Sequence, residues 1–299
     1  MAATSSERTD HHHPAVLRMS EPDMRYAYTS VASAASRADG SPMPQTVAVV
    51  GRGRVGTALA AALRAAGTTV DGPLGRLETT SADTVLLCVP DSEITAAATT
   101  HARVGAPARF VGHVSGATTL SALEPARRAG AAVFGLHPLQ TFSVGAAPSL
   151  SGVGAAIAGS TSPALARARA LAECLGMVAF ELDDERRASY HAAASIGSNF
   201  LVTLEATAEA VAARAGFASD EARALLVPLV RQTVENWVAR GPEAALTGPV
   251  ARGDATTVAA QRSAVIDADP AFGPLFDALV ERTEALAARR TGIAHEVVA

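Results

Sequence analysis

The spacing of apolar and polar residues divides the chain into three parts. Residues 1–45 contain no apolar run that could form a core strand or the buried face of a helix. From residue 46 to 182, short aliphatic runs alternate with helix-like or turn segments, which is the order expected for βαβ units. After residue 183 the apolar residues recur with helical period. We therefore predict a disordered tail at 1–45, an α/β domain at 46–182 and an all-α domain at 183–299.

The α/β part has several runs that we interpret as strands, at residues 46–50, 68–71, 84–89, 109–113, 131–136, 153–158 and 177–182. Their succession is typical of a parallel sheet. In the all-α part, capping residues with acidic neighbours mark helix starts at Asp183, Ser219 and Asp254. Two apolar helical stripes, at 200–211 and 225–237, exceed what a short helix hairpin needs. We expect a homodimer through this domain, although a core within one chain explains the same pattern.

The first strand leads directly into three glycines with the spacing of a dinucleotide-binding turn, Gly51, Gly53 and Gly56. The first allows a tight turn, the second a close approach of the backbone to pyrophosphate, and the third close packing of helix on strand. The alanine-rich segment that follows supplies a helix N-terminus, whose N–H groups bind phosphate. This order indicates a Rossmann-type doubly wound sheet that binds a dinucleotide, with Arg54 and Val55 of the turn beside the cofactor.

The sequence gives two conflicting signals for the type of dinucleotide. Asp71 follows Gly51 at the spacing of about 20 residues at which an acid binds the ribose hydroxyls of NAD. Arg76 lies in the next loop, however, and a guanidinium suits the 2′-phosphate of NADP. We favour NADP(H), with NAD(H) as the alternative.

Other polar residues lie where strands end, which is where ligands bind in open α/β sheets. Val89, Pro90 and Asp91 end one predicted strand and are expected along the nucleotide, although a local capping role explains them equally well. Ser115 and His137 follow two later strands, so we expect both in the cleft. A histidine at a strand end is also often an ordinary packing residue.

A third group of polar residues lies in the all-α part. His191, Ser195 and Asn199 are spaced at i, i+4 and i+8 and are predicted to form one stripe on a helix. Their neighbours are alanine, isoleucine and phenylalanine rather than charged residues, which favours burial at a domain boundary over a solvated surface face.

In several segments the chain resembles a family of Rossmann-like oxidoreductases with a helical C-terminal domain: the glycine turn, 113–116, 136–140, 190–193 with 198–199, and 246–249 with 252–254. That family is related to β-hydroxyacid dehydrogenases, ketopantoate reductases and pyrroline-5-carboxylate reductases. Some members are similar to a divergent type of ketopantoate reductase, which reduces a 2-oxo acid with NADPH. The resemblance implies reduction of a small 2-oxo acid. The first candidate reaction is reduction of 2-dehydropantoate (ketopantoate) to pantoate. An imine reductase similar to pyrroline-5-carboxylate reductase is the alternative.

One departure bears on mechanism: all 25 Lys and Arg residues of the chain are arginine. Many of the related enzymes use a lysine on the first long helix of the second domain as acid or base. Hydride delivery to a carbonyl still requires a proton donor active near neutral pH, and histidine fits. We therefore expect His191 to donate the proton, with His137 as the second candidate. The missing lysine also supports a different class, a sensor that binds NADP(H) without turnover.

The remaining roles follow from the same scheme. Ser195 and Asn199 are expected to hydrogen-bond to the reacting oxygen, and Ser115 with His137 to line the nicotinamide side. Arg252 is the candidate clamp for the substrate carboxylate, with Asp254 orienting it or binding a substrate hydroxyl. Asp254 alternatively serves only as a helix cap.

Composition narrows the class further. A formal charge of −4 without a dense basic block excludes an electrostatic footprint for nucleic acid or an anionic membrane. No apolar run approaches the length of about 20 residues that spans a bilayer. Cys88 and Cys174 lie in apolar runs and predict reduced thiols in a cytoplasmic protein. The three adjacent histidines of the tail make a poor metal site, and we expect no metal.

Overall fold

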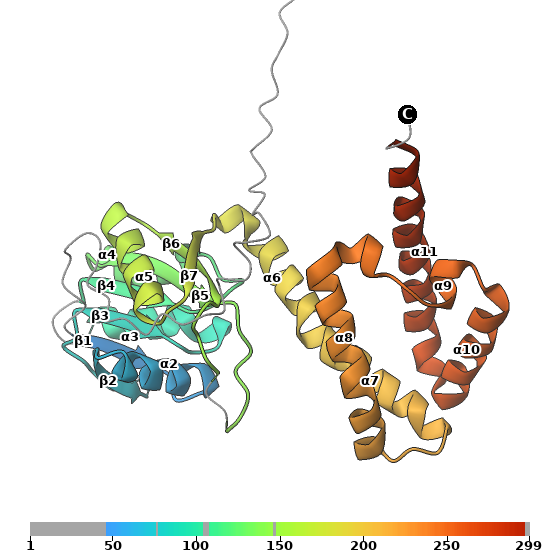
Figure 1. Cartoon of the computed structure of the whole chain (residues 1–299). Coiled ribbons are helices and arrows are strands. Elements are labelled where there is room, and N and C mark those ends of the chain that lie inside the picture. The colour runs from blue at the N-terminus through green and yellow to red at the C-terminus, as the bar shows by residue number, and fades with distance from the viewer. Residues whose placement is uncertain (1–45, 76, 104–107, 146–147, 297–299) are drawn as a thin grey trace, which may run out of the picture. The chain divides into compact units, whose positions relative to one another are not determined.

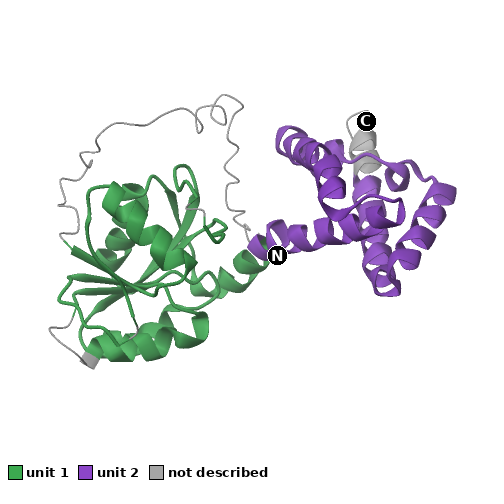
Figure 2. Ribbon diagram, turned by 90° about the horizontal axis from the view of Figure 1, so that it is seen from below, with its two compact units in different colours: residues 1–193 green, residues 194–299 purple. Residues whose placement is uncertain are grey.

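The computed structural model describes residues 46–75, 77–103, 108–145 and 148–296, which fall into two compact units (Figure 1). Unit 1 contains the described residues up to Ala193, and unit 2 begins at Ala194 (Figure 2). The predicted boundary at 182/183 lies earlier in the chain than this division. The reason is that helix α6 (Arg187–Gly197) begins with side chains bonded into unit 1. The predicted tail at 1–45 lies outside the described residues.

Unit 1 is built on one seven-stranded sheet of order β2-β1-β3-β4-β5-β6-β7. Its strands are β1 (Thr46–Val50), β2 (Thr69–Leu74), β3 (Thr84–Leu87), β4 (Phe110–His113), β5 (Ala132–Pro138), β6 (Gly154–Gly159) and β7 (Val178–Glu181). All pairs are parallel except β5–β6. The described residues between β5 and β6 form no crossover helix, so the chain returns in the opposite direction. The predicted Rossmann-type fold class is confirmed, with this one antiparallel pair.

Helices cover both faces of the sheet. Alternate residues of β1 point to opposite faces, so Val47 and Val49 join one apolar core while Ala48 and Val50 join the other. The first core is completed by α2 (Arg54–Ala65) and α5 (Ser162–Cys174), and the second by α3 (Ile94–Arg103) and α4 (Glu124–Arg128). Short 3₁₀ turns, η1 (Asp91–Glu93), η2 (Leu120–Leu123) and η3 (Asp184–Arg186), precede α3, α4 and α6.

Unit 2 is entirely helical in its described part. It consists of the end of α6, then α7 (Asn199–Arg214), α8 (Ser219–Ala245), α9 (Pro249–Arg252), α10 (Ala255–Ala268), the 3₁₀ turn η4 (Pro270–Phe272) and α11 (Gly273–Glu296). The helix start predicted at Asp254 is observed, and Asp254 caps α10 by accepting a hydrogen bond from the Thr257 N–H. α8 does begin at Ser219, but its N-cap position is Ala218, so Ser219 is not the predicted capping residue. At Asp183 the chain forms the 3₁₀ turn η3 first, and the helix α6 begins only at Arg187. Within the described chain, no helix is both long and apolar enough to cross a membrane.

Few apolar side chains in the described part of unit 2 are fully buried. Among its described residues, only Ala222 and Val265 are buried apolar residues. Leu229 and Trp237 of α8 are 63% and 57% exposed, and Phe200 of α7 is 56% exposed. The two apolar stripes predicted from the sequence are therefore present, but they do not close into a core within the described part of this unit.

Candidate functional site

The glycine turn has the geometry that its spacing predicts. Gly51 has a φ of +121° and lies so close to the carbonyl of Cys88 that a Cβ would overlap it. A Cβ on Gly56 would likewise overlap the carbonyl oxygen of Gly51, so this glycine allows α2 to pack against the turn. No atom lies within 4 Å of the place that a Cβ of Gly53 would take. Of the three glycines, only Gly53 therefore leaves the backbone open to a ligand. This is the position that must approach a pyrophosphate.

Other residues of the turn have separate roles. Arg54 begins α2 and is exposed, and Val55 packs against the core. The turn sits where the strand order reverses, between β1 and β3, and this is the usual place for a dinucleotide.

The end of the second strand differs from the prediction. We predicted that it ends at Asp71, but β2 continues to Leu74 and Asp71 pairs with Ala48 in the middle of β1. The strand is extended because Leu74 pairs with Val50 after an irregularity in the register. Asp71 therefore does not stand at the carboxyl edge of the sheet. Arg76, assigned to the 2′-phosphate, lies outside the described residues.

A carboxylate that the sequence did not single out lies beyond β2. Glu78 accepts a hydrogen bond from the N–H of Gly75 at 2.9 Å and forms an ion pair with Arg52 of the glycine turn. These contacts hold the pKa of Glu78 below its usual value, and the hydrogen bond from the Gly75 N–H has the largest effect.

The end of β3 adjoins the glycine turn. Cys88 donates its N–H to Val50 O at 2.7 Å, and burial raises the pKa of its thiol to about 12, so it is unreactive at neutral pH. Val89 packs against the second core, and Pro90 occupies the N-cap position of η1, whose first residue is Asp91. The Pro90 carbonyl accepts the Glu93 N–H at 2.8 Å, but η1 has no side-chain cap hydrogen bond, so the capping role weighed for this segment is not observed. Asp91 is exposed and near enough to His113 and His137 to favour their charged forms.

The loop after β4 is ordered by its own side chains. His113 ends β4, is fully buried, and accepts at Nδ1 a hydrogen bond from the Ser115 N–H. The Ser115 hydroxyl accepts bonds from the N–H groups of Ala117 and Thr118 at 3.2 and 2.9 Å. Ser115 thus stabilises the turn around Gly116. Its hydroxyl group can still donate a hydrogen bond to a ligand.

Two histidines meet over Gly116. A Cβ on Gly116 would lie 2.7 Å from Nδ1 of His191 and 2.8 Å from Nε2 of His137, so a larger residue there would displace an imidazole. The two imidazole centroids are 6.0 Å apart. His137 belongs to β5 rather than to the loop after it, and its Nδ1 lies 2.7 Å from the hydroxyl of Tyr190. His191 Nδ1 is buried and has no hydrogen-bond partner among the described residues.

The charge state of this cluster follows from its burial. Desolvation, then the charges of His191 and Arg187, lower the pKa of His137 to about 4. Burial raises the pKa of Tyr190 to about 12. Both partners of the 2.7 Å hydrogen bond are therefore neutral at neutral pH, and one proton lies between them.

Arg187 was missed by the sequence analysis. Its side chain is 1% exposed, donates Nε to Asp184 at 2.7 Å and reaches the Ser115 carbonyl at 3.5 Å. It passes over β5, where a Cβ on Gly135 would lie 2.8 Å from its Nη2. Arg187 thus ties the start of α6 to the loop that carries Gly116. The i, i+3 spacing of Asp184 and Arg187 at a predicted helix start was the available signal.

The predicted polar stripe is broken. His191 and Ser195 lie on α6, but Ser198 leaves helical geometry and Asn199 begins a second helix, α7. The Ser198 hydroxyl donates to the Ala194 carbonyl at 2.6 Å and contacts the Asn199 side chain, and Gly197 before it favours the break. The expectation of one continuous stripe is therefore wrong at Asn199.

The last predicted site residues lie in unit 2. Arg252 ends α9 and is exposed. Both carboxylate oxygens of Asp254 bond to Thr257, at 3.1 Å to its N–H and 2.6 Å to its hydroxyl. Asp254 therefore acts as a cap, which was one of the two interpretations of this residue. The described residues contain no group of three or more His, Cys, Asp or Glu side chains that could hold a metal ion.

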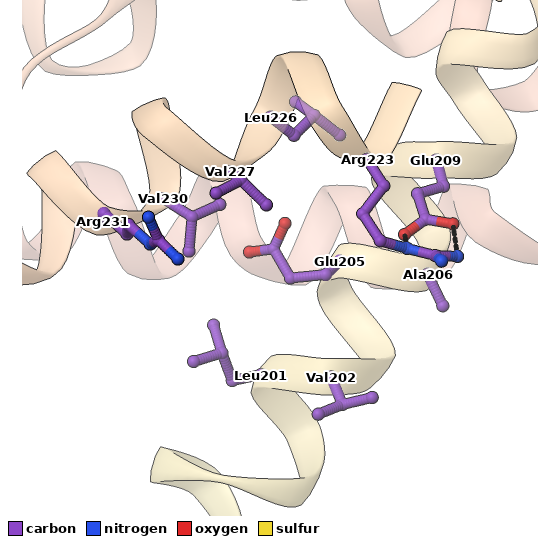
Figure 3. A pocket seen from close by; sticks show the side chains of 10 residues that line it. All are labelled: Leu201, Val202, Glu205, Ala206, Glu209, Arg223, Leu226, Val227, Val230 and Arg231. Carbon is purple, nitrogen blue, oxygen red and sulfur yellow. Dashed lines mark hydrogen bonds and ion pairs between the residues drawn. The ribbon is translucent and has the colours of Figure 1, made fainter. Parts of the chain in front are cut away.

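Unit 2 also contains a groove of about 560 Å³ that was not predicted (Figure 3). It lies between α7 and α8 and is lined mainly by aliphatic side chains, among them Leu201 and Val230. Its polar lining includes Glu205, Arg231 and the ion pair of Arg223 with Glu209.

Comparison with known proteins supports the fold. A family model described as a domain of unknown function (DUF2520) matches residues 153–283. A solved Bacteroides fragilis protein, described provisionally as an NADP oxidoreductase, is 21% identical with a TM-score of 0.71 over 81% of this chain and 99% of its own. A Thermotoga maritima protein is 23% identical with a TM-score of 0.66 and covers the same shares.

A more distant structure is pyrroline carboxylate reductase of Plasmodium falciparum with NADP bound. It is 12% identical with a TM-score of 0.54, over 83% of this chain and 100% of its own. No curated protein sequence matches the chain. At these identities the comparisons establish a Rossmann-like fold with a helical C-terminal region.

Proposed function

We propose that the protein is an oxidoreductase that uses NADPH to reduce a small 2-oxo acid. The observation that carries the proposal is that a glycine turn with dinucleotide-binding geometry and a pair of half-buried histidines occupy the same edge of one sheet. β1, β4 and β5 are parallel, so the glycine turn after β1, Gly116 after β4 and His137 near the end of β5 all lie at the carboxyl edge. A dinucleotide binds along this edge in folds of this kind.

The residues of the turn fit the proposed cofactor. Gly53 and the N-terminus of α2 would hold the pyrophosphate, because the backbone is open there and the first N–H groups of the helix are free to bind anions. Arg54, Val55, Val89, Pro90 and Asp91 would line the nucleotide. Bound NADPH would supply the hydride for the reduction.

The histidine pair accounts for the proton. We assign proton donation to His191, because a pKa of about 4 leaves His137 neutral and unable to serve as a cationic acid near pH 7. In this scheme the Tyr190 hydroxyl donates to Nδ1 of His137, which leaves a proton on Nε2 beside Gly116. A neutral His137 then donates a hydrogen bond to a ligand at the nicotinamide side, together with the Ser115 hydroxyl.

For the substrate we keep the roles that the sequence suggests. Ser195 and Asn199 would hydrogen-bond to the reacting oxygen, and Arg252 would bind the carboxylate. Asp254 keeps a supporting role only: its oxygens cap α10, and the hydrogen bonds from Thr257, with a smaller contribution from the charge of Arg252, lower the pKa of this acid. Ketopantoate is the first candidate substrate, as the family resemblance implies.

An imine substrate is the second candidate. Pyrroline carboxylate reductase of Plasmodium falciparum and the reductive aminase of Aspergillus terreus share the fold, the latter with a TM-score of 0.58 in its complex with NADPH and ethyl levulinate. Protonation by a histidine suits the nitrogen of a forming amine as well as an alkoxide oxygen.

We also propose that the protein is a homodimer through unit 2. Stable helical domains bury an apolar stripe, yet Leu229, Trp237 and Phe200 are more than half exposed. A second copy of the same unit would cover these side chains, because an isologous interface brings identical patches together. The free thiols Cys88 and Cys174 fit a cytoplasmic location.

The test is NADPH oxidation with a panel of ketopantoate, other small 2-oxo acids and cyclic imines. We expect saturable oxidation with a 2-oxo acid. Turnover of a cyclic imine alone would replace the substrate class by the second candidate. Tight NADPH binding without turnover of any panel member would favour a sensor, and failure to bind NADPH would remove the proposed function altogether.

A further inference from the structure

An ion pair joins the glycine turn to the loop after β2. Arg52, the residue between Gly51 and Gly53, donates Nε to the Pro73 carbonyl at 3.3 Å and pairs through Nη2 with Glu78. Glu78 is fixed from its other side by the N–H of Gly75. The carboxylate is therefore held between the Arg52 guanidinium and the Gly75 N–H, although its side chain remains 46% exposed.

This position matters for a dinucleotide. The adenosine ribose of a nucleotide bound to a Rossmann fold lies beside the carboxyl end of the second strand. A carboxylate there accepts hydrogen bonds from the ribose hydroxyls, whereas a guanidinium binds a 2′-phosphate. Asp71 is the acid at the usual sequence spacing, but it pairs with Ala48 in the middle of the sheet. Among the described residues, Glu78 is the carboxylate that contacts the glycine turn from this loop.

Glu78 and Arg52 have opposite effects on the binding of a 2′-phosphate. Glu78 is ionised at neutral pH, because its contacts hold its pKa below the usual value. A 2′-phosphate would meet repulsion from this carboxylate and would have to draw Arg52 away from it. A ribose 2′-hydroxyl is not repelled by the carboxylate and does not need to displace Arg52. It can donate a hydrogen bond to the carboxylate.

We propose that Glu78 sets the choice of cofactor by limiting the preference for NADPH over NADH. The carboxylate accepts a hydrogen bond from the 2′-hydroxyl of NADH, and it competes with the 2′-phosphate of NADPH for Arg52. This inference rests on the proposed function, since it requires that the glycine turn binds a dinucleotide.

The experiment measures the dissociation constants of NADPH and NADH for the full-length chain and for Glu78→Gln, by titration without substrate. Glutamine keeps the size and the hydrogen-bonding oxygen but removes the charge. We expect NADPH to bind about fivefold more tightly and NADH about twofold more weakly, so that the ratio of the two constants changes about tenfold.

Glu181→Gln is the matched control. Glu181 forms a comparable exposed pair with Arg169 at 2.7 Å, but it lies on β7, at the opposite edge of the sheet from β2. Both dissociation constants should stay at their original values. Arg52→Met provides the reciprocal test: NADPH binding should weaken about tenfold while NADH binding changes by less than about twofold.

The failures are distinguishable. If the unaltered chain binds neither nucleotide, the proposed function fails. If it binds a nucleotide and Glu78→Gln leaves the NADPH to NADH ratio unchanged, the role of Glu78 is refuted. Equal weakening of both nucleotides by Glu78→Gln leaves that ratio unchanged and therefore refutes the role as well. An unchanged ratio in Arg52→Met would refute the competition for Arg52, and with it the inference.

Discussion

The hydroxyl oxygen of Tyr190 lies 2.7 Å from Nδ1 of His137, and this bond joins the start of α6 to β5. It holds His137 with its Nε2 beside Gly116 and next to His191. The bond connects residues 53 positions apart in the chain, and it explains how a histidine of the sheet and a histidine of the helix come to share one small space.

The first prediction concerns pH. Burial lowers the pKa of His113 and His137 to about 4, so an unfolded chain binds protons below about pH 6.5 that the folded chain does not. The free energy of unfolding is therefore highest above about pH 6.5 and should fall as pH decreases to about 4, by on the order of 2–3 kcal/mol per histidine. The charged or titratable neighbours of these two groups are Arg187, Tyr190, His191, Asp91 and Asp184. Urea denaturation at a series of pH values measures the effect, and His137→Gln should remove part of the slope. An unchanged slope in this variant would contradict the assignment.

The second prediction concerns proton transfer. His191→Gln should lower kcat by about 100- to 10,000-fold while nucleotide affinity is kept, because the glycine turn is untouched. kcat for carbonyl reduction should fall as pH rises through the pKa of the donor, and this limb should vanish in the variant. Normal turnover in His191→Gln, together with loss of the limb in His137→Gln, would transfer the role of donor to His137.

The third prediction separates two glycines of the same turn. Gly51→Ala should lower the free energy of unfolding by at least about 2 kcal/mol, because its φ is +121° and a Cβ would overlap Cys88. Gly53→Ala should change it by less than about 0.5 kcal/mol, since nothing lies near its Cβ position. It should nevertheless weaken NADPH about tenfold or more, because the methyl group points to the place of the pyrophosphate. Unaltered NADPH affinity in a folded Gly53→Ala chain would place the nucleotide elsewhere.

The fourth prediction concerns assembly. Light scattering at micromolar concentration should give twice the chain mass of 30.3 kDa. Leu229→Asp should shift the protein toward the monomer, because it places a charge on a half-exposed apolar face of α8. Val144→Asp is the control, since Val144 of unit 1 is 86% exposed and lies outside the proposed interface. A monomeric unaltered chain would refute the dimer.

The fifth prediction concerns Arg76, which remains a sequence-based assignment. Arg76→Ala should weaken NADPH by about 1.5–3 kcal/mol and NADH far less, because a charge-assisted bond to the 2′-phosphate is lost. Equal losses for both nucleotides would refute it.

Local pattern was sufficient for much of the fold. The strands, the glycine turn and the helix starts at Ser219 and Asp254 depend on short-range periodicity, φ requirements and capping, which a single sequence displays. The reversal of β6 was not predicted, because strand direction depends on whether a crossover helix intervenes, and apolar runs alone do not show this. The continuation of β2 past Asp71 was missed because Gly72 and Pro73 are typical strand breakers.

The candidate site was predictable only in part. His137 and His191 were selected separately, from a strand end and from a helix face, but their contact over Gly116 is a tertiary feature. Arg187 escaped notice because arginine is rarely buried, so a burial of 99% in a helix start has no compositional signal. Asn199 was placed on the wrong helix because the hydrogen bond from Ser198 to the backbone competes with helical geometry.

The most direct test of the account is whether the nicotinamide end of the cofactor reaches the histidine pair. Imidazole resonances can be followed by NMR while NADP⁺ is added, and compared with 2′-phospho-ADP-ribose, which lacks the nicotinamide. His101 is the internal control, because it is buried in the last turn of α3, at the opposite edge of the sheet from Gly116. We predict that His137 and His191 shift with NADP⁺ but not with the truncated nucleotide, while His101 stays unchanged with both. Identical responses of His137 and His191 to the two ligands, or none to saturating NADP⁺, would contradict the proposed site.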